Sequence, residues 1–374
     1  MAGLYLHIPF CKKSCHYCNF HFSTSDKNKA EVIASICKEL GLRAKELKGA
    51  VLESIYFGGG TPSLLSKGNL DLIFHTIEQN FQLIPTAEIT LEANPDDLSL
   101  QKIKQLAATP INRLSIGIQS FFESDLKAMN RAHTAKEAHK SLIKAQEYFN
   151  NISIDLLYGM PQMSAARWKK NLQMAFDLKL QHLSCYAMTV EPKTALEHFI
   201  KTHQHPPMGQ SVAAAHFEIL KAATAKAGFI HYEVCSFGKP GYFSRHNSSY
   251  WLGKSYLGLG PSAHSFDGHK RSWNVSNNSQ YIKALVNDEL PLTSETLTAE
   301  NRFNEYLMTG LRTMWGVSLE HIEKEFGSEF QSALLNNASS HVASENLVLE
   351  NQHLKITPKG QFLSDGIASD LFIL

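Results

Sequence analysis

The sequence has no long hydrophobic run and no surplus of charge of either sign. No apolar stretch approaches the roughly 18 residues that span a membrane, and the first ten residues lack the basic start and long apolar core of a signal peptide. A cytoplasmic protein is therefore expected. The 36 Lys and Arg side chains nearly balance the 35 Asp and Glu side chains, which leaves a net charge of +1. This balance argues against general electrostatic binding to nucleic acid or anionic lipid, because such binding depends on many phosphate contacts.

Cysteine is scarce outside one short segment. The chain has 374 residues, of which 43% are hydrophobic, so it can bury a core without disulfides or structural metal. In a reducing compartment its thiols stay free or bind metal. Three of the six cysteines fall within eight residues, at Cys11, Cys15 and Cys18, and this cluster calls for a chemical explanation. The other three stand alone and are expected to be ordinary buried residues: Cys37, Cys185 and Cys235.

Six short β-rich runs alternate with helical patterns in the first half of the chain. The predicted strands are residues 4–8, 54–57, 88–91, 113–118, 152–157 and 182–188, and the clearest helical patterns are 26–48, 68–81, 135–149 and 165–178. This alternation predicts an α/β fold with parallel strands and crossover helices. A partly closed barrel and an open sheet both fit six such units, and periodicity alone does not choose between them.

Polar signatures follow the predicted strands, at the ends where parallel α/β folds carry their chemistry. The cysteine cluster follows the first strand, and Gly58-Gly59-Gly60-Thr61-Pro62 follows the second. Glu92-Ala93-Asn94-Pro95 and Gln119-Ser120 follow the third and fourth, and Asp155 lies within the fifth. A functional site is therefore expected at this end of the strands.

The pattern changes twice in the second half of the chain. Residues 189–278 contain one predicted helix, at 210–227, and an irregular aromatic-rich stretch at 237–266 that is expected to be functional. After a boundary at 290–291, helical patterns at 299–314, 318–326 and 329–345 precede a hairpin at 347–357 and a final helix. Residues 1–290 are thus expected to form one domain, and residues 291–374 a small, mainly helical, winged-helix-like domain. Without a basic surplus, that domain is interpreted as a packing or partner module, with DNA binding as the alternative.

The spacing of the cysteine cluster indicates a metal site. Cys11-Lys-Lys-Ser-Cys15-His-Tyr-Cys18 places three thiols on one short loop, which suits three corners of an iron–sulfur cube and leaves one iron open. Zinc is the alternative, because a Cys₃His site could recruit one of three nearby histidines as its fourth ligand. These histidines are His7, His16 and His21.

The cluster motif is preceded by Tyr-Leu-His-Ile-Pro-Phe at residues 5–10 and followed by Tyr-Phe-Gly-Gly-Gly-Thr-Pro at 56–62. Over nearly its whole length the chain resembles the radical S-adenosylmethionine (SAM) superfamily, in the branch of oxygen-independent coproporphyrinogen III oxidase and its HemW-type haem chaperone relatives. The resemblance implies a partial (β/α)₆ barrel and a 4Fe-4S cluster held by Cys11, Cys15 and Cys18. In that superfamily the open iron chelates SAM, and the reduced cluster can cleave it to a 5′-deoxyadenosyl radical.

The resemblance also implies a set of residues that hold SAM: Tyr5, Gly59, Gly60, Thr61, Glu92, Gln119, Arg131 and Asp155. Their chemistry suits the task, since Arg131 offers a fork to a carboxylate while Glu92 or Asp155 can accept from ribose hydroxyls or an ammonium group. Taken singly, Asp155 could instead cap a strand end and Arg131 could lie on a helix surface.

Three features separate this chain from the oxidase pattern. The oxidase has a further cysteine two positions after its third ligand, where this chain has Phe20, and a long extension before the motif, where this chain starts four residues ahead of Tyr5. His246-Asn247-Ser-Ser-Tyr250-Trp251 also matches the His-Asn-x-x-Tyr-Trp signature of the chaperone branch. These features favour a haem chaperone over the alternative, a radical enzyme that decarboxylates a porphyrinogen.

The chaperone branch binds haem and is thought to deliver it to haem-requiring proteins such as respiratory enzymes. His246 is the candidate axial ligand, with Tyr250 and Trp251 to pack on the porphyrin, and His264 is a second candidate. A structural His–Asn turn with a core aromatic pair is the alternative for this motif. The resemblance leaves room for a homodimer and for peripheral contact with the inner face of a membrane. A zinc-stabilised barrel without a redox role is the third hypothesis.

Overall fold

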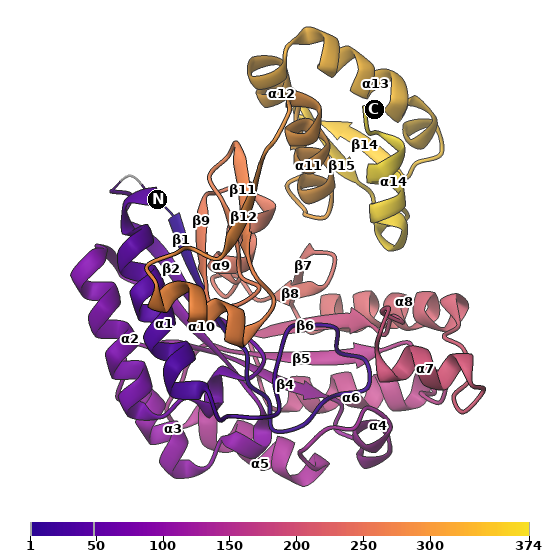
Figure 1. Ribbon diagram of the computed structural model, residues 1–374. Helices are drawn as coiled ribbons and strands as arrows, with labels where there is room; N and C mark the ends of the chain where they lie inside the picture. Colours follow the sequence, from indigo (N-terminus) through magenta and orange to yellow (C-terminus); the bar gives the residue numbers. More distant parts are fainter. Residues whose placement is uncertain (1, 48, 374) are drawn as a thin grey trace.

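Six parallel strands form the centre of the computed structural model, which describes residues 2–47 and 49–373 (Figure 1). They are β1 (Ala2–Ile8), β2 (Leu52–Gly59), β3 (Leu83–Ala93), β4 (Arg113–Gln119), β5 (Ile152–Tyr158) and β6 (His182–Ala187). Each pairs in parallel with the next one along the chain, so the prediction of six parallel strands is confirmed. The sheet ends in two free edges, and the strands therefore form an open, partial barrel.

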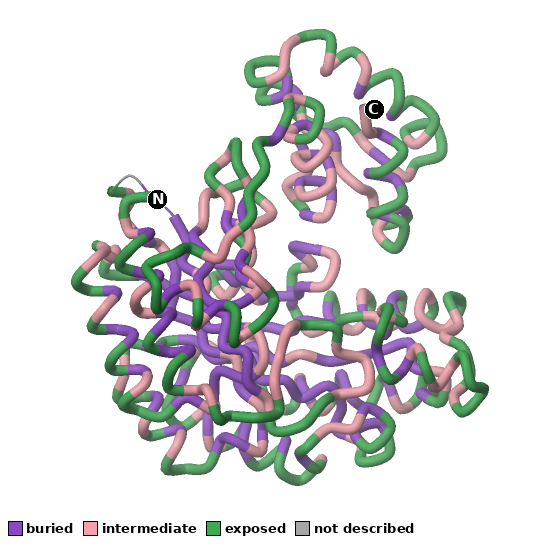
Figure 2. Tube along the Cα trace, viewed as in Figure 1, coloured by how far each residue is buried: buried purple, intermediate pink, exposed green. Residues whose placement is uncertain are grey.

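Helices cover the outer face of this sheet (Figure 1). The helices of residues 29–226 are α1 (Lys29–Arg43), α2 (Lys67–Asn80), α3 (Leu100–Ala107), α4 (Glu123–Ala128), α5 (Ala135–Gln146), α6 (Ala165–Asp177), α7 (Ala195–Lys201) and α8 (Gln210–Lys226), with short 3₁₀ turns η1 (Ala44–Leu47), η2 (Pro62–Leu64) and η3 (Pro95–Asp97). Of these, α4 and α7 lie beyond the carboxyl ends of the strands. Ser66 and Thr134 start α2 and α5 with capping boxes, in which each side chain accepts from the backbone N–H three residues on. Figure 2 shows buried strands inside and exposed helix surfaces outside, as expected for crossover helices on a parallel sheet.

The stretch 237–266 is not irregular, and that expectation was wrong. This part of the chain forms β7 (Ile230–Glu233), β8 (Ser236–Gly238), α9 (Arg245–Trp251), β9 (Tyr256–Leu259) and β10 (His264–Phe266), followed by β11 (Lys270–Asn274), α10 (Asn278–Val286) and β12 (Leu292–Thr296). β8 pairs antiparallel with β6, and β9 pairs parallel with β1, so these strands extend both sides of the sheet. Strands of three to five residues are too short to show a period, and only pairing with neighbours defines them.

The C-terminal residues form a separate small layer of helices with its own core (Figure 1). It contains α11 (Ala299–Leu311), β13 (Val317–Ser318), α12 (Leu319–Phe326), α13 (Ser328–Ala343), β14 (Leu347–Glu350), β15 (His353–Ile356), η4 (Gln361–Leu363) and α14 (Ser364–Asp370). The predicted hairpin is confirmed, because β14 and β15 pair antiparallel. β12 pairs with β11 in the large sheet, so the change in composition at 290–291 precedes the last strand of the barrel.

The small domain joins the barrel through the β7–β8 hairpin. The Val234 N–H donates to the Arg312 carbonyl at 3.0 Å, and the Met314 N–H donates to the Tyr232 carbonyl at 3.0 Å. The Arg312 guanidinium also forms ion pairs with Glu233 at 3.2 Å and with Asp365 of α14 at 2.6 Å. These contacts place the small domain beside the carboxyl ends of the barrel strands. Within residues 2–47 and 49–373, no helix combines the length and apolar character needed to cross a membrane.

Candidate cluster and cofactor site

The three clustered cysteines line one cavity of about 790 Å³ at the carboxyl ends of the strands. Their loop leaves β1 and returns to it, because the Cys11 N–H donates to the Ser23 carbonyl at 3.0 Å and the Ser23 N–H donates to the Pro9 carbonyl at 2.9 Å. The Cys18 N–H donates to the Cys15 carbonyl at 3.3 Å, which closes a turn between the last two thiols. The structure thus brings together the three side chains that the motif predicts.

Hydrogen-bond donors from the segments that follow β2 and α4 reach two of the thiols. Thr61 Oγ1 donates to Cys11 Sγ at 3.4 Å, and Arg131 Nη1 donates to Cys15 Sγ at 3.3 Å. Asn94 links these two donors, because it accepts from Arg131 Nη2 at 2.6 Å and donates to Thr61 Oγ1 at 3.1 Å. Donors of this kind stabilise thiolate sulfur, so the cavity wall is suited to cysteines that bind iron.

Burial favours the protonated form of two of the three thiols, Cys11 and Cys18. It raises the pKa of the Cys11 thiol to about 11, against the hydrogen bond from Thr61, and the nearby thiols of Cys18 and Cys15 add to the rise. Burial also raises the pKa of Cys18. A bound metal deprotonates its thiol ligands, so an iron–sulfur cluster would hold these cysteines as thiolates despite their burial.

The structure does not bring a histidine to the three cysteines, as the zinc alternative requires. None of the three candidate histidines lines the cavity of the cysteines. His7 Nε2 donates to the His21 carbonyl at 2.9 Å, His16 Nδ1 donates to the Ala128 carbonyl at 3.1 Å, and His21 Nε2 lies 2.8 Å from Asn278 Oδ1. Among the described residues, no three His, Cys, Asp or Glu side chains are gathered to hold a metal ion.

The glycine turn after β2 is required by close packing under the cysteine loop. Gly59 has φ +110°, and a Cβ at this position would lie 2.8 Å from the His7 ring. A Cβ on Gly60 would lie 2.7 Å from the Phe10 carbonyl oxygen, which is backbone and has no freedom to move away. Gly59, Gly60 and Thr61 line the cavity, and their contact with SAM stays a prediction from the resemblance.

Two carboxyl groups face the cavity from strands on either side of β4. Glu92 of β3 accepts a hydrogen bond from Tyr56 Oη at 2.8 Å, and Asp155 of β5 accepts from Ser115 Oγ at 3.5 Å. Burial raises the pKa of Glu92 to about 8, and the charge of Asp155 adds to the rise. Burial raises the pKa of Asp155 to about 6. Two buried carboxyl groups with raised pKa values therefore line one cavity. Such a pair suits a cationic or hydroxyl-rich ligand.

Gln119 and Arg131 also line the cavity. Gln119 ends β4 with φ 62°, a left-handed backbone that a non-glycine residue rarely adopts and that turns the chain at the cavity wall. Arg131 is not a surface helix residue, since Nη2 donates to the Gly117 carbonyl at 2.8 Å beneath the cysteine loop. Both residues therefore belong to the cavity, and their role toward SAM stays a prediction.

Tyr5 is placed differently from the other predicted SAM residues. It is not part of the cavity wall and lies lower in the barrel, where its Oη lies 3.1 Å from His7 Nδ1. Its ring stacks on Tyr56 with centroids 6.2 Å apart and covers Gly58, at which a Cβ would lie 2.9 Å from Tyr5 Cε2. Tyr5 therefore supports the cavity from below.

The haem candidates lie away from the cysteines. α9 packs at the amino ends of β1 and β2, where His246 reaches Ser54 Oγ at 2.8 Å and lies against Gly3. His246 has no exposed surface, and its second ring nitrogen lies 2.7 Å from Tyr250 Oη. Burial lowers its pKa to about 3. With both nitrogens in hydrogen bonds, His246 is placed here as a structural histidine, and iron ligation would require α9 to move.

The two remaining aromatic or histidine candidates are more accessible. Trp251 packs under the Arg312 guanidinium at 5.0 Å, which links α9 to the small domain. His264 is exposed on β10 and stacks on Trp273 with centroids 6.0 Å apart. Neither lines the cavity that holds the cysteines.

Sequence reasoning missed several residues of the cavity. Asn94 lines the cavity and stands inside a quoted motif, so its proximity to Glu92 could have singled it out. Tyr56, which lies beneath the cavity and donates to Glu92, also stands inside a quoted motif. The far wall had no such signal, because the small domain contributes it: Arg312, Gln361, Phe362 and Asp365. Cys235, expected to be an ordinary buried residue, is only partly buried and lines this far wall.

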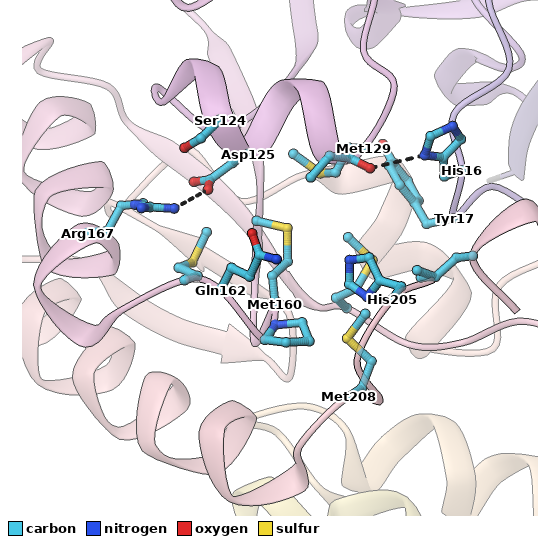
Figure 3. Close-up of a pocket in the computed structure, with 15 residues that line it drawn as sticks. His16, Tyr17, Ser124, Asp125, Met129, Met160, Gln162, Arg167, His205 and Met208 are labelled. Atoms are coloured by element: carbon cyan, nitrogen blue, oxygen red, sulfur yellow. Dashed lines mark hydrogen bonds and ion pairs between the residues drawn. The ribbon is translucent and has the colours of Figure 1, made fainter. Parts of the chain in front are cut away.

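A second pocket, of about 40 Å³, lies behind the cysteine loop (Figure 3). Its wall includes five methionines: Met129, Met160, Met163, Met188 and Met208. His16 anchors the loop here, because its N–H donates to the Met129 carbonyl at 3.2 Å and its carbonyl accepts from the Leu196 N–H at 2.8 Å. Tyr17 lines both pockets. The methionine side chains of the smaller pocket pack against it and hold the cysteine loop on the barrel.

Comparison with known proteins agrees with this geometry. A model of the radical SAM superfamily matches residues 5–202, and a model of the HemN C-terminal domain matches residues 297–363. The protein named heme chaperone HemW from Bacillus subtilis (strain 168) is 31% identical over 377 residues, covering 98% of both chains. The mitochondrial radical S-adenosyl methionine domain-containing protein 1 of Bos taurus is 30% identical over 390 residues, covering 99% of this chain and 87% of that protein.

A solved structure shows the same fold. Coproporphyrinogen III oxidase (HemN) from Escherichia coli superposes with a TM-score of 0.86 at 22% identity, covering 99% of this chain and 90% of that one. The likeness extends over the barrel and the small domain together. Because one family model covers more than half of the chain and a full-length HemW relative is 31% identical, this chain, with its HemN C-terminal domain, belongs to the radical SAM superfamily and within it to the HemW family.

Proposed function

We propose that this protein is a haem chaperone, which binds a 4Fe-4S cluster, SAM and haem and delivers haem to haem-requiring proteins. The observation that carries the proposal is the 31% identity to the heme chaperone HemW of Bacillus subtilis over 98% of both chains. The cavity supports the first two ligands, since three cysteines and two carboxyl groups line it. Membership of the radical SAM superfamily itself implies the cluster and SAM.

Each polar residue of the cavity has a role toward SAM in this proposal. The cluster, when bound, supplies a free iron and a source of one electron beside the sulfonium. Cys11, Cys15 and Cys18 hold it. Arg131, which lines the cavity, would pair with the carboxylate of SAM, and Glu92 and Asp155 would accept from its ammonium and hydroxyl groups. Gly59, Gly60, Thr61 and Gln119 shape the wall so that ligand atoms can approach backbone groups.

Haem binding is assigned to α9, with His246 as the axial ligand and Tyr250 and Trp251 against the porphyrin. This assignment requires His246 to leave Ser54 and Tyr250, so haem uptake would open the amino end of the barrel. His264, exposed on β10, is the second ligand candidate and needs no such movement.

His246→Ala is expected to weaken haem retention, as measured by titration of the haem absorption band. The change also leaves the hydroxyls of Ser54 and Tyr250 without a partner, which should lower the free energy of unfolding by about 2 kcal/mol. Ser54→Ala is the matched control, because it removes one of these hydrogen bonds and keeps the imidazole. Unchanged haem affinity in His246→Ala would remove this residue from the ligand assignment.

Anaerobic reconstitution with iron and sulfide tests the function as a whole. The reduced protein should give a 4Fe-4S electron paramagnetic resonance signal that shifts when SAM is added, and it should bind haem stably. Incubation of the reduced holoprotein with coproporphyrinogen III and SAM should produce no protoporphyrinogen IX. Conversion to that product would overturn the chaperone assignment in favour of the oxidase.

The partners in this proposal are haem-accepting proteins such as respiratory enzymes, and no nucleic acid. The protein would act in the cytoplasm, as a monomer or a homodimer. Transfer of labelled haem from the holoprotein to an apo-respiratory protein, with free haem as the comparison, would establish the delivery step.

A further inference from the structure

Four aromatic side chains form a column through the inside of the barrel, from just below the cavity to α9. Tyr56 of β2 stacks on Tyr5 of β1 with ring centroids 6.2 Å apart and on His246 of α9 with centroids 5.0 Å apart. The planes of these two pairs differ by 22° and 23°. Tyr250 meets His246 edge-on at 4.9 Å and 83°. We call Tyr5, Tyr56, His246 and Tyr250 the aromatic column.

The upper end of the aromatic column holds a SAM-site carboxyl. Tyr56 Oη donates to Glu92 Oε1 at 2.8 Å, and Glu92 lines the cavity of the cysteines. Tyr56 is only 8% exposed and is packed between two rings, so its hydroxyl has little freedom to follow a displaced carboxyl. The position of Glu92 therefore depends on the position of the Tyr56 ring.

The lower end of the aromatic column is fixed to α9. Both ring nitrogens of His246 are held, by Ser54 Oγ at 2.8 Å and by Tyr250 Oη at 2.7 Å. The buried Glu88 carboxylate accepts from the backbone N–H groups of Arg245 and His246, each at 3.0 Å, which secures the first turn of α9. Any movement of α9 that withdraws His246 removes the surface on which Tyr56 rests.

We propose that Tyr56 is a positioning residue that couples α9 to the SAM site. It fixes Glu92 for SAM while His246 is in place and releases Glu92 when His246 moves. The coupling to haem rests on the proposed function, in which haem draws His246 away from Ser54 and Tyr250. Haem and SAM then weaken each other's binding by the same factor, because linkage between two sites is reciprocal. A protein loaded with haem would hold SAM loosely, and one loaded with SAM would hold α9 closed.

The test measures the dissociation constant of SAM for the cluster-loaded protein by anaerobic equilibrium dialysis, with and without saturating haem. Haem should raise the constant of the wild-type protein about 5- to 10-fold, within the usual range of coupling between sites. Without haem, Tyr56→Phe should raise it about 5- to 10-fold, as expected for one hydrogen bond to a charged group. Haem should have no further effect on that variant.

A double-mutant cycle separates positioning from general loosening. If Tyr56 acts through Glu92, the Tyr56→Phe/Glu92→Gln pair should bind SAM no more weakly than Glu92→Gln alone. Tyr306→Phe is the matched control, because it also removes a tyrosine hydroxyl, one that accepts from the Ser318 N–H at 2.8 Å in the small domain. It should leave the SAM constant unchanged. Iron content and circular dichroism confirm that each variant is loaded and folded.

The outcomes are distinguishable from those of the proposed function. Additive losses in the cycle, or unchanged SAM binding in Tyr56→Phe, would overturn the positioning role. Independent binding of haem and SAM to the wild-type protein would overturn the coupling. If the wild-type protein binds no haem, the proposed function fails at that step, and the cycle with Glu92 still decides the role of Tyr56.

Discussion

Cys18→Ala is expected to abolish the iron–sulfur cluster and, with it, tight binding of SAM. Cys18 lines the same cavity as Cys11 and Cys15, and none of the three candidate histidines lines that cavity to replace a lost thiolate. With two thiolates a cube has two open irons and is exposed to solvent, so reconstituted protein should fall from about four irons per chain to a small residue. Iron and sulfide analysis and electron paramagnetic resonance after anaerobic reconstitution measure this loss.

Cys37→Ala is the matched control for this prediction. Cys37 lies in α1, is partly buried and lies outside the cavity, so its removal should leave iron content and the SAM-induced change in the signal intact. Zinc in the purified wild-type protein, or a full cluster in Cys18→Ala, would contradict the assignment of the three ligands.

Glu92→Gln is expected to change stability and SAM binding in opposite directions. The pKa of Glu92 is raised from 4.5 to about 8 by burial, with Asp155 adding to the rise, so the folded protein retains a proton that the unfolded chain releases. Stability without SAM therefore falls as pH rises from 4.5 to about 8. An uncharged amide at this position removes that cost, and at pH 8 it should raise the free energy of unfolding by about 2 kcal/mol.

The same change should weaken SAM binding by about tenfold or more, because a hydrogen bond to a charged acceptor is lost. Denaturant titrations of the cluster-loaded protein at pH 5 and pH 8, without SAM, measure the stability difference. It should be small at pH 5, where Glu92 is protonated in the folded state, and large at pH 8. Glu320→Gln, a change at an exposed position on α12, is the control and should show no such difference. A loss of stability at pH 8 in Glu92→Gln would contradict the raised pKa.

The opposite signs follow from one cause. A site that holds two carboxyls in a buried cavity is strained until a cationic ligand arrives, and residues that serve binding are often unfavourable for folding. Asp155 lines the same cavity as Glu92, and burial raises its pKa to about 6. SAM, as a cation, would lower the cost of burying both carboxyl groups.

The sequence by itself determined the parallel α/β fold and the cysteine cluster. Strands such as β4 and β5 are buried at nearly every residue and lie between amphipathic helices, so local periodicity predicts them and their parallel pairing. Cys11, Cys15 and Cys18 are neighbours along the chain, so their meeting needs no long-range information. Glu92, Gln119 and Asp155 were found because the carboxyl ends of parallel strands meet at one end of a barrel.

Only the tertiary structure decided which side chains meet across the barrel. Short strands such as β8 and β9 exist because they pair with the edges of a sheet that is built elsewhere, and no local period shows this. The far wall of the cavity comes from Arg312 and the small domain, more than a hundred residues after the strands it faces. His246 was singled out by its motif, but its burial against Tyr56 and Ser54 depends on the packing of α9 under β1 and β2. Contacts between distant segments are set by how whole elements pack, and that information lies in no single stretch of sequence.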